Sequence, residues 1–191
     1  MMYQIIQPPF TLVFREMPKK ELKDYKEWFL RSIPERIQIL TSAVKSTPGY
    51  EKWEADYSPK SLESLGEWFH AQVDTRSRTQ EEIDNIHSRS SFRIDVSDQE
   101  LTNKTFSLAM DIGMYLSQVF LKNHASLEWS QPFGGKKFVD YGQPVLLGFG
   151  KVPFNPVRMM VTQAYGLVSK NKTGRNLRGL YDYWSKLISV A

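Results

Sequence analysis

The longest helical pattern in the chain, residues 97–123, most restricts what this sequence can fold into. Apolar side chains recur there at the three- and four-residue spacing that is typical of a helix packed on a core. SDQE at 97–100 matches a capping box, in which Ser97 and Glu100 satisfy free backbone N–H groups. We therefore predict a helix over 97–123 whose buried face consists of Leu101, Phe106, Leu108, Ile112, Tyr115, Leu116, Val119 and Phe120.

Gly113 lies inside this pattern, at a position where glycine costs about 1 kcal/mol relative to alanine. Close packing of another element against the helix would explain the presence of a residue without a side chain. We therefore expect a neighbouring element to lie against Gly113.

Prolines divide the N-terminal part of the chain into shorter predicted elements. FTLVF at 10–14 is apolar and β-prone, which predicts a strand. Pro18 stands before an amphipathic stripe over 19–32, which predicts a helix. Pro34 is then expected to restart the chain as a second helix, because proline breaks the hydrogen-bond ladder of a helix interior.

Two further helix starts are predicted in the middle of the chain. Ser58 and Pro59 suit the N-cap and the first helical position, because proline needs no N–H there. Thr79 and Glu82 match a second capping box, which predicts a short helix over 79–88.

A corner rich in glycine and proline follows the predicted long helix. Strands are expected over 126–131 and 143–149, and the glycines at the end of the second strand let the chain bend. Asn155 as N-cap and Pro156 as the first helical residue then begin another helix. A last helix is predicted from residue 175 onward.

The elements together predict one domain over residues 1–191, with an α+β fold that is predominantly helical. The expected sheet is small and antiparallel, built from 126–149 and from 10–14. Hydrophobic residues make up 41% of the chain and aromatic residues 13%, which is enough for a sizeable core.

The sequence favours a cytoplasmic location. It contains no cysteine, which excludes disulfides, thiolate metal sites and cysteine nucleophiles and fits a reducing compartment. The first 14 residues carry no charge and make a poor signal peptide, and no run approaches the 18 apolar residues that indicate a membrane span. We therefore expect no association with a membrane.

Positive charge is concentrated in the C-terminal part of the chain. From Lys136 onward the chain contains nine lysine and arginine residues and two aspartates, a net charge of +7. The preceding residues carry a net charge of −3. Such asymmetry indicates either a solvated basic face or an anionic partner such as nucleic acid. The residues that would bind phosphate in the second case are Lys170, Lys172, Arg175 and Arg178, although no known nucleic-acid-binding motif accompanies them.

No pattern for catalysis or cofactor binding stands out. His70, His87 and His124 lie far apart without the spacing of a metal site. GLVSKNKT at 166–173 resembles a phosphate-binding loop but lacks its second glycine and follows a predicted helix rather than a strand. We therefore expect a non-catalytic protein that carries no metal or cofactor and that binds another protein.

The predicted partner surface is the turn PFGGKKFVDYG at 132–142, which is longer than a hairpin needs. Its aromatic side chains beside lysines resemble a binding hot spot, in which apolar anchors are ringed by polar groups. The alternative is an ordinary loop whose aromatic residues fold into the core. The residues proposed to contact a partner are Trp129, Phe133, Lys136, Lys137, Phe138 and Tyr141.

Five strings in a fixed order carry a resemblance over most of the chain: YKEWFLRSIPERIQIL, SPKSLESLGEWF, AMDIGMYLSQVFLKNHASLEW, FVDYGQPVLLGF and FNPVR. With them the chain resembles small uncharacterised cytosolic proteins of Gram-positive, Bacillus-type bacteria. It also loosely resembles immunity-type proteins. The resemblance implies a fold and a role in binding a toxin or another protein partner, but no catalytic residue.

Overall fold

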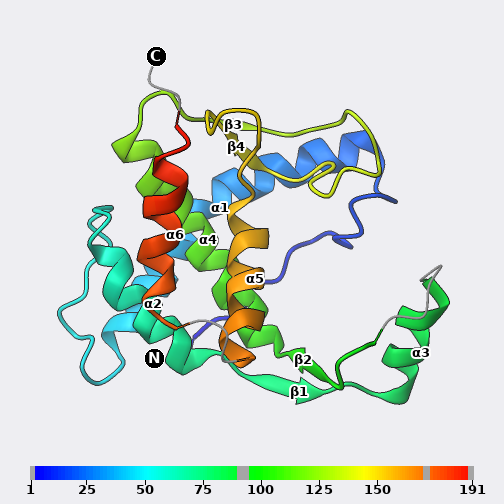
Figure 1. The fold of residues 1–191 in the computed structure, drawn as a ribbon, viewed down its shortest axis with the longest axis horizontal. Helices are drawn as coiled ribbons and strands as arrows, with labels where there is room; N and C mark the ends of the chain where they lie inside the picture. The colour runs from blue at the N-terminus through cyan, green and yellow to red at the C-terminus, as the bar shows by residue number, and fades with distance from the viewer. Residues whose placement is uncertain (1–2, 90–94, 170–172, 189–191) are drawn as a thin grey trace.

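The computed structural model describes residues 3–89, 95–169 and 173–188, and Figure 1 shows how its elements are arranged. Six helices and two antiparallel sheets of two strands each confirm a predominantly helical α+β fold in this part of the chain. In chain order the elements are α1 (Lys19–Lys45), α2 (Ser61–Gln72), β1 (Thr75–Ser77), α3 (Gln80–Arg89), β2 (Gln99–Leu101), α4 (Asn103–Asn123), β3 (Glu128–Ser130), β4 (Val145–Leu147), α5 (Pro156–Val168) and α6 (Asn176–Ser185).

Helix α4 forms the centre of the core. Its side chains are buried almost all the way round, which is the pattern of a helix enclosed by other elements. Helices α1, α5 and α6 contact it, and Figure 1 shows α5 and α6 lying beside it. The prediction for Gly113 is confirmed, because a Cβ atom there would lie 3.0 Å from backbone atoms of Pro156 and Val157.

The predicted break at Pro34 is wrong. Helix α1 continues through Pro34 to Lys45, and Ile33 and Ile37 are buried on either side of it. Pro34 itself is exposed, and because it has no N–H the carbonyl of Leu30 loses its helical partner. Burial of the apolar face over the whole helix outweighs this local cost.

The predicted strand over 10–14 is also wrong. Leu12 has a φ of 60°, outside the β region, and no strand among the described residues pairs with this segment. The rings of Phe10 and Phe14 pack edge-on against Tyr25, with centroids 5.5 and 5.1 Å away. The apolar run therefore covers α1 with side chains and forms no backbone ladder.

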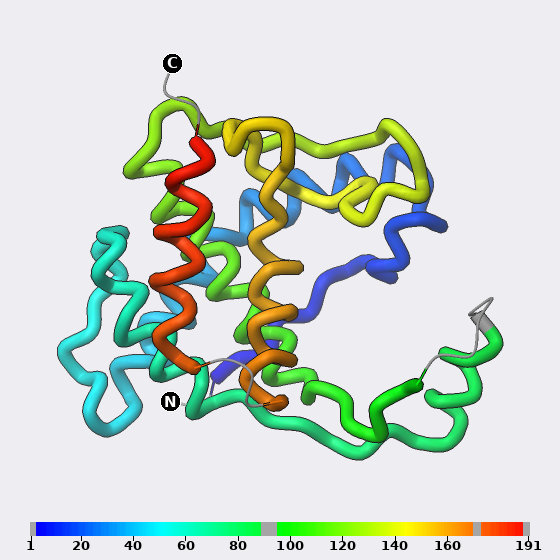
Figure 2. The backbone as a smooth tube through the Cα atoms, in the orientation of Figure 1, coloured from blue at the N-terminus to red at the C-terminus, as the bar shows by residue number. Residues whose placement is uncertain are grey.

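The start of α4 differs from the prediction as well. Residues 99–101 form β2 and pair with β1, and Thr102 caps the helix by accepting a hydrogen bond from the Thr105 N–H. Glu100, the expected capping partner of Ser97, forms an ion pair with Arg78 instead. The β1–β2 ribbon carries α3 away from the helical body, as Figure 2 shows. The capping box between Thr79 and Glu82 is confirmed at the start of α3.

The predicted corner between β4 and α5 is confirmed. The strands β3 and β4 pair antiparallel, and Gly148 and Gly150 adopt positive φ values of 114° and 69° after β4 ends. Asn155 caps α5 by accepting a hydrogen bond from the Arg158 N–H at 3.0 Å, and Pro156 is its first residue.

Replacing Asn155 with alanine should lower the free energy of unfolding by about 2–3 kcal/mol, which denaturant unfolding would measure. A lost cap alone costs about 1 kcal/mol. Asn155 is buried and also donates to Asp140 and Gln143, both at 2.9 Å, so alanine leaves the buried Asp140 and the half-buried Gln143 without this donor. Asn155→Ser keeps a capping oxygen and should lose about half as much. Equal losses in both variants would contradict this account of the side chain.

Candidate partner-binding loop

The loop that joins β3 to β4, residues 131–142, is fixed at its neck by hydrogen bonds. The Gly142 N–H donates to the Pro132 carbonyl at 2.8 Å. The Gln131 side chain donates to the carbonyls of Gly142 and Leu22 at 2.8 and 2.6 Å. Because Leu22 belongs to α1, the loop runs beside the N-terminal end of that helix (Figure 1).

Gly142 suits this neck for two independent reasons. Its φ of 70° lies in the left-handed region that favours glycine. A Cβ atom at this position would also lie 2.7 Å from a methyl carbon of Leu22. A side chain at Gly142 would therefore push the loop away from α1.

The structure divides the predicted partner residues into two groups. Tyr141 is buried, and its ring packs edge-on against Phe133, which is half-buried, at 6.0 Å. Trp129 is also half-buried, with its ring 5.7 Å from that of Phe29 on α1. These three aromatic residues support the loop from the core side.

The exposed group forms the tip of the loop, which we define as residues 136–139. Lys136 and Lys137 are exposed, and the side chain of Phe138 retains 39% of its accessible surface. Val139, at 51%, was not among the predicted residues. The signal that could have identified it is its place directly after Phe138, in a segment too polar to form a core strand.

Asp140 anchors the tip to the start of α5. Its carboxylate is buried and accepts two hydrogen bonds from Arg158, one from Nε at 2.7 Å and one from Nη2 at 2.9 Å. Such bidentate pairs combine charge with fixed geometry. Since the structure describes every residue of 131–142, the exposed charges of this loop are Lys136 and Lys137 alone, both positive.

The predicted phosphate-binding residues are only partly placed, because Lys170 and Lys172 lie outside the described residues. Arg178 is engaged by Asp182 at 2.9 Å and Glu63 at 3.2 Å, and the hydrogen bond to Asp182 raises its pKa. The Arg175 side chain is 88% exposed and lies 3.8 Å from Glu67. Carboxylates thus accompany both described arginines, which gives little support to an anion site here.

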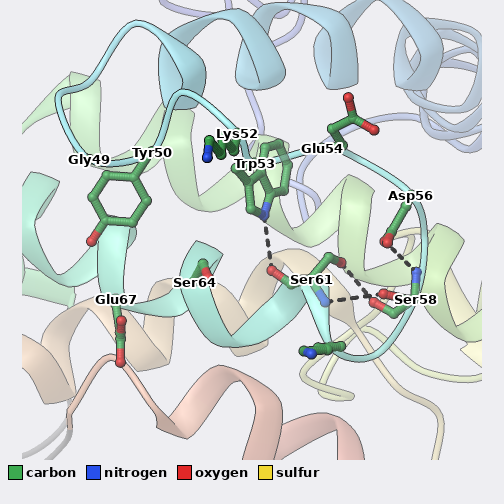
Figure 3. Close-up of a pocket in the computed structure, with 11 residues that line it drawn as sticks. Gly49, Tyr50, Lys52, Trp53, Glu54, Asp56, Ser58, Ser61, Ser64 and Glu67 are labelled. Carbon is green, nitrogen blue, oxygen red and sulfur yellow. Dashed lines mark hydrogen bonds between the residues drawn. The ribbon is translucent and has the colours of Figure 1, made fainter.

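A hollow of about 710 Å³ lies between α2 and the segment 49–60 that precedes it (Figure 3). Several of its polar groups already have partners: Trp53 Nε1 donates to the Ser61 carbonyl at 3.0 Å, and Asp56 accepts from the Ser58 N–H at 2.8 Å. Figure 3 shows Glu54 and Glu67 on opposite sides of the hollow. Glu54 and Glu67 therefore do not form a close pair of carboxylates of the kind that glycoside hydrolysis uses.

A metal site would bring several histidine or acidic side chains together. Among residues 3–89, 95–169 and 173–188, no group of three or more histidine, aspartate or glutamate side chains could hold a metal ion. His124 lies at the end of α4, with its Nε2 3.0 Å from the Tyr181 hydroxyl, and burial lowers its pKa. In the same described ranges, no helix has the length and apolar character needed to cross a bilayer.

In comparisons with family models, curated proteins and solved structures, nothing matches this chain.

Proposed function

We propose that this chain is a non-catalytic protein-binding module that contacts its partner through the tip at 136–139. The observation that supports the proposal is an apolar pair, Phe138 and Val139, exposed at 39% and 51%. The loop that carries the pair is held by hydrogen bonds and by the ion pair of buried Asp140 with Arg158. Fixing the neck in advance lowers the entropy that the loop loses on binding. Aromatic anchors of this kind contribute much of the affinity of protein interfaces.

The charge beside the tip favours an acidic partner. Lys136 and Lys137 directly precede Phe138, and both are exposed. The start of α1, beside which the loop runs, carries charges of both signs, so the preference for an acidic partner rests on the positive charge of the tip itself. A partner with an apolar pocket bordered by aspartate or glutamate would match this surface in shape and sign. We include a cytoplasmic location and an immunity-type or regulatory role in the proposal, because the absence of cysteine and the resemblance described above favour them.

The double variant Phe138→Ala/Val139→Ser should bind the partner about 30-fold or more weakly, the loss typical of a hot spot. The wild-type chain is used as bait in cells, and captured proteins are then purified and titrated against each variant. Val152→Ser is the matched control, since Val152 is 56% exposed but lies outside the loop. A partner that binds the tip variant as tightly as the wild type, or that is lost equally with Val152→Ser, would refute the proposed surface.

A further inference from the structure

A second feature, independent of the loop, is an apolar cavity of about 220 Å³ beneath the N-terminal segment. Its wall comes from that segment, from α1, α4 and α5, and from the residues just before β4. The side chains that make it apolar are Leu12, Phe14, Phe106, Met110, Val157 and Val161.

The amide side chains at the edge of this cavity are already engaged. Asn155 donates to Gln143 Oε1 at 2.9 Å, and Gln143 Nε2 donates to the Val139 carbonyl at 3.0 Å. Buried polar groups normally have partners of this kind. These two residues therefore close the cavity without needing a ligand.

Tyr25 is different. Its side chain lines the cavity and retains only 2% of its accessible surface, yet its hydroxyl makes no hydrogen bond to the rest of the protein. Every fully enclosed polar side-chain atom in the described residues does have a partner. The Tyr25 hydroxyl therefore retains some accessible surface, and we infer that it faces the cavity that its side chain lines. Burial also raises the pKa of Tyr25, so the hydroxyl keeps its proton and can donate it.

Charge and size restrict what could occupy the cavity. No residue in its wall other than Tyr25 is titratable, so a charged ligand would lose its hydration without gaining a counter-ion. An apolar cavity of about 150 Å³ accommodates benzene. By proportion, the cavity of about 220 Å³ would hold a compound with about nine non-hydrogen atoms. The aromatic and thioether side chains of the wall favour a ligand with a planar aromatic ring.

We propose that this cavity binds a small uncharged aromatic compound that accepts a hydrogen bond from the Tyr25 hydroxyl.

Three probes of equal size test the proposal by calorimetric titration of the full chain. Acetophenone is uncharged and carries a carbonyl acceptor, cumene is uncharged without an acceptor, and benzoate is an anion. We expect acetophenone to bind about fivefold to tenfold more tightly than cumene, the contribution of one hydrogen bond. Benzoate should not bind measurably. Benzoate binding as tightly as acetophenone, or no binding of either uncharged probe at about millimolar concentration, would overturn the proposal.

Tyr25→Phe is the decisive variant, because it removes the hydroxyl and keeps the ring. It should weaken acetophenone binding about fivefold to tenfold and leave cumene binding unchanged. Its thermal stability should not fall, since the hydroxyl has no partner to lose. Val161→Phe fills the cavity and should abolish binding of both uncharged probes. Unchanged acetophenone affinity in Tyr25→Phe, or binding that survives Val161→Phe, would place the probe elsewhere and refute the site.

Discussion

Replacing Asp111 with alanine should lower the free energy of unfolding by about 3–5 kcal/mol, the usual cost of breaking a buried ion pair. Asp111 is fully buried on α4 and accepts two hydrogen bonds from Arg36 of α1, each at 2.8 Å. The Tyr3 hydroxyl donates to the same carboxylate. Alanine would leave the Arg36 guanidinium, whose side chain is 6% exposed, without its counter-ion. Chemical denaturation followed by tryptophan fluorescence measures the loss.

Two comparisons separate this effect from general damage to the core. Lys45→Ala breaks the exposed pair with Glu54, whose atoms are 3.8 Å apart, and should change stability very little. The double variant Arg36→Met/Asp111→Leu replaces both charges with apolar groups and should recover most of the loss. If the double variant is as unstable as Asp111→Ala, apolar side chains cannot replace the ion pair, and the prediction is wrong.

Replacing Phe120 with alanine should also lower the free energy of unfolding by about 3–5 kcal/mol, because it opens a cavity at the centre of the core. The Phe120 ring is fully buried, and ring centroids of Phe149, Phe154 and Tyr181 lie 5.1, 5.2 and 4.6 Å from it. These rings come from the corner after β4 and from α6. The substitution therefore loosens the contact of both segments with α4.

Phe120→Leu is the matched control for this prediction. It retains an apolar side chain of intermediate volume and should cost clearly less than alanine. Phe138→Ala removes the same ring from an exposed position and should change stability far less. A similar loss for Phe120→Ala and Phe138→Ala would contradict the assignment of Phe120 to the core.

The parts of the fold that follow local rules could be predicted from the sequence. Helical periodicity identified the buried face of α4, and the type of residue at Asn155 and Pro156 identified the start of α5. Gly113 indicated close packing, because glycine lowers the stability of a helix relative to alanine and a close neighbour explains why it is nevertheless present. Each of these signals depends on neighbouring residues alone.

The errors arose where tertiary contacts outweigh local preference. Pro34 continues α1 because burial on both sides of it compensates for one lost hydrogen bond, and no local pattern reports that burial. The strand β2 forms because β1 supplies a partner, which the capping pattern at Ser97 cannot reveal.

Features that depend on contacts between residues far apart in the chain could not be predicted from the sequence. They include the division of the loop residues into buried and exposed groups, and the apolar cavity. Phe133, Phe138 and Tyr141 look equivalent in the sequence, and only packing distinguishes the buried Tyr141 from the exposed Phe138. The apolar cavity is assembled from segments far apart along the chain, so no spacing motif could indicate it. The ion pair of Arg36 with Asp111 joins residues 75 positions apart.

The long separation of the partners around Asp111 also has a consequence for how the chain folds. Tyr3 and Asp111 are 108 positions apart, and contacts of such separation slow folding because a long loop must close first. On the ribosome, α1 emerges well before the α4 residue that neutralises Arg36. The nascent chain therefore carries an apolar helix face without its cover until more than half of the polypeptide has been synthesised, and during that interval it is a natural substrate for chaperones.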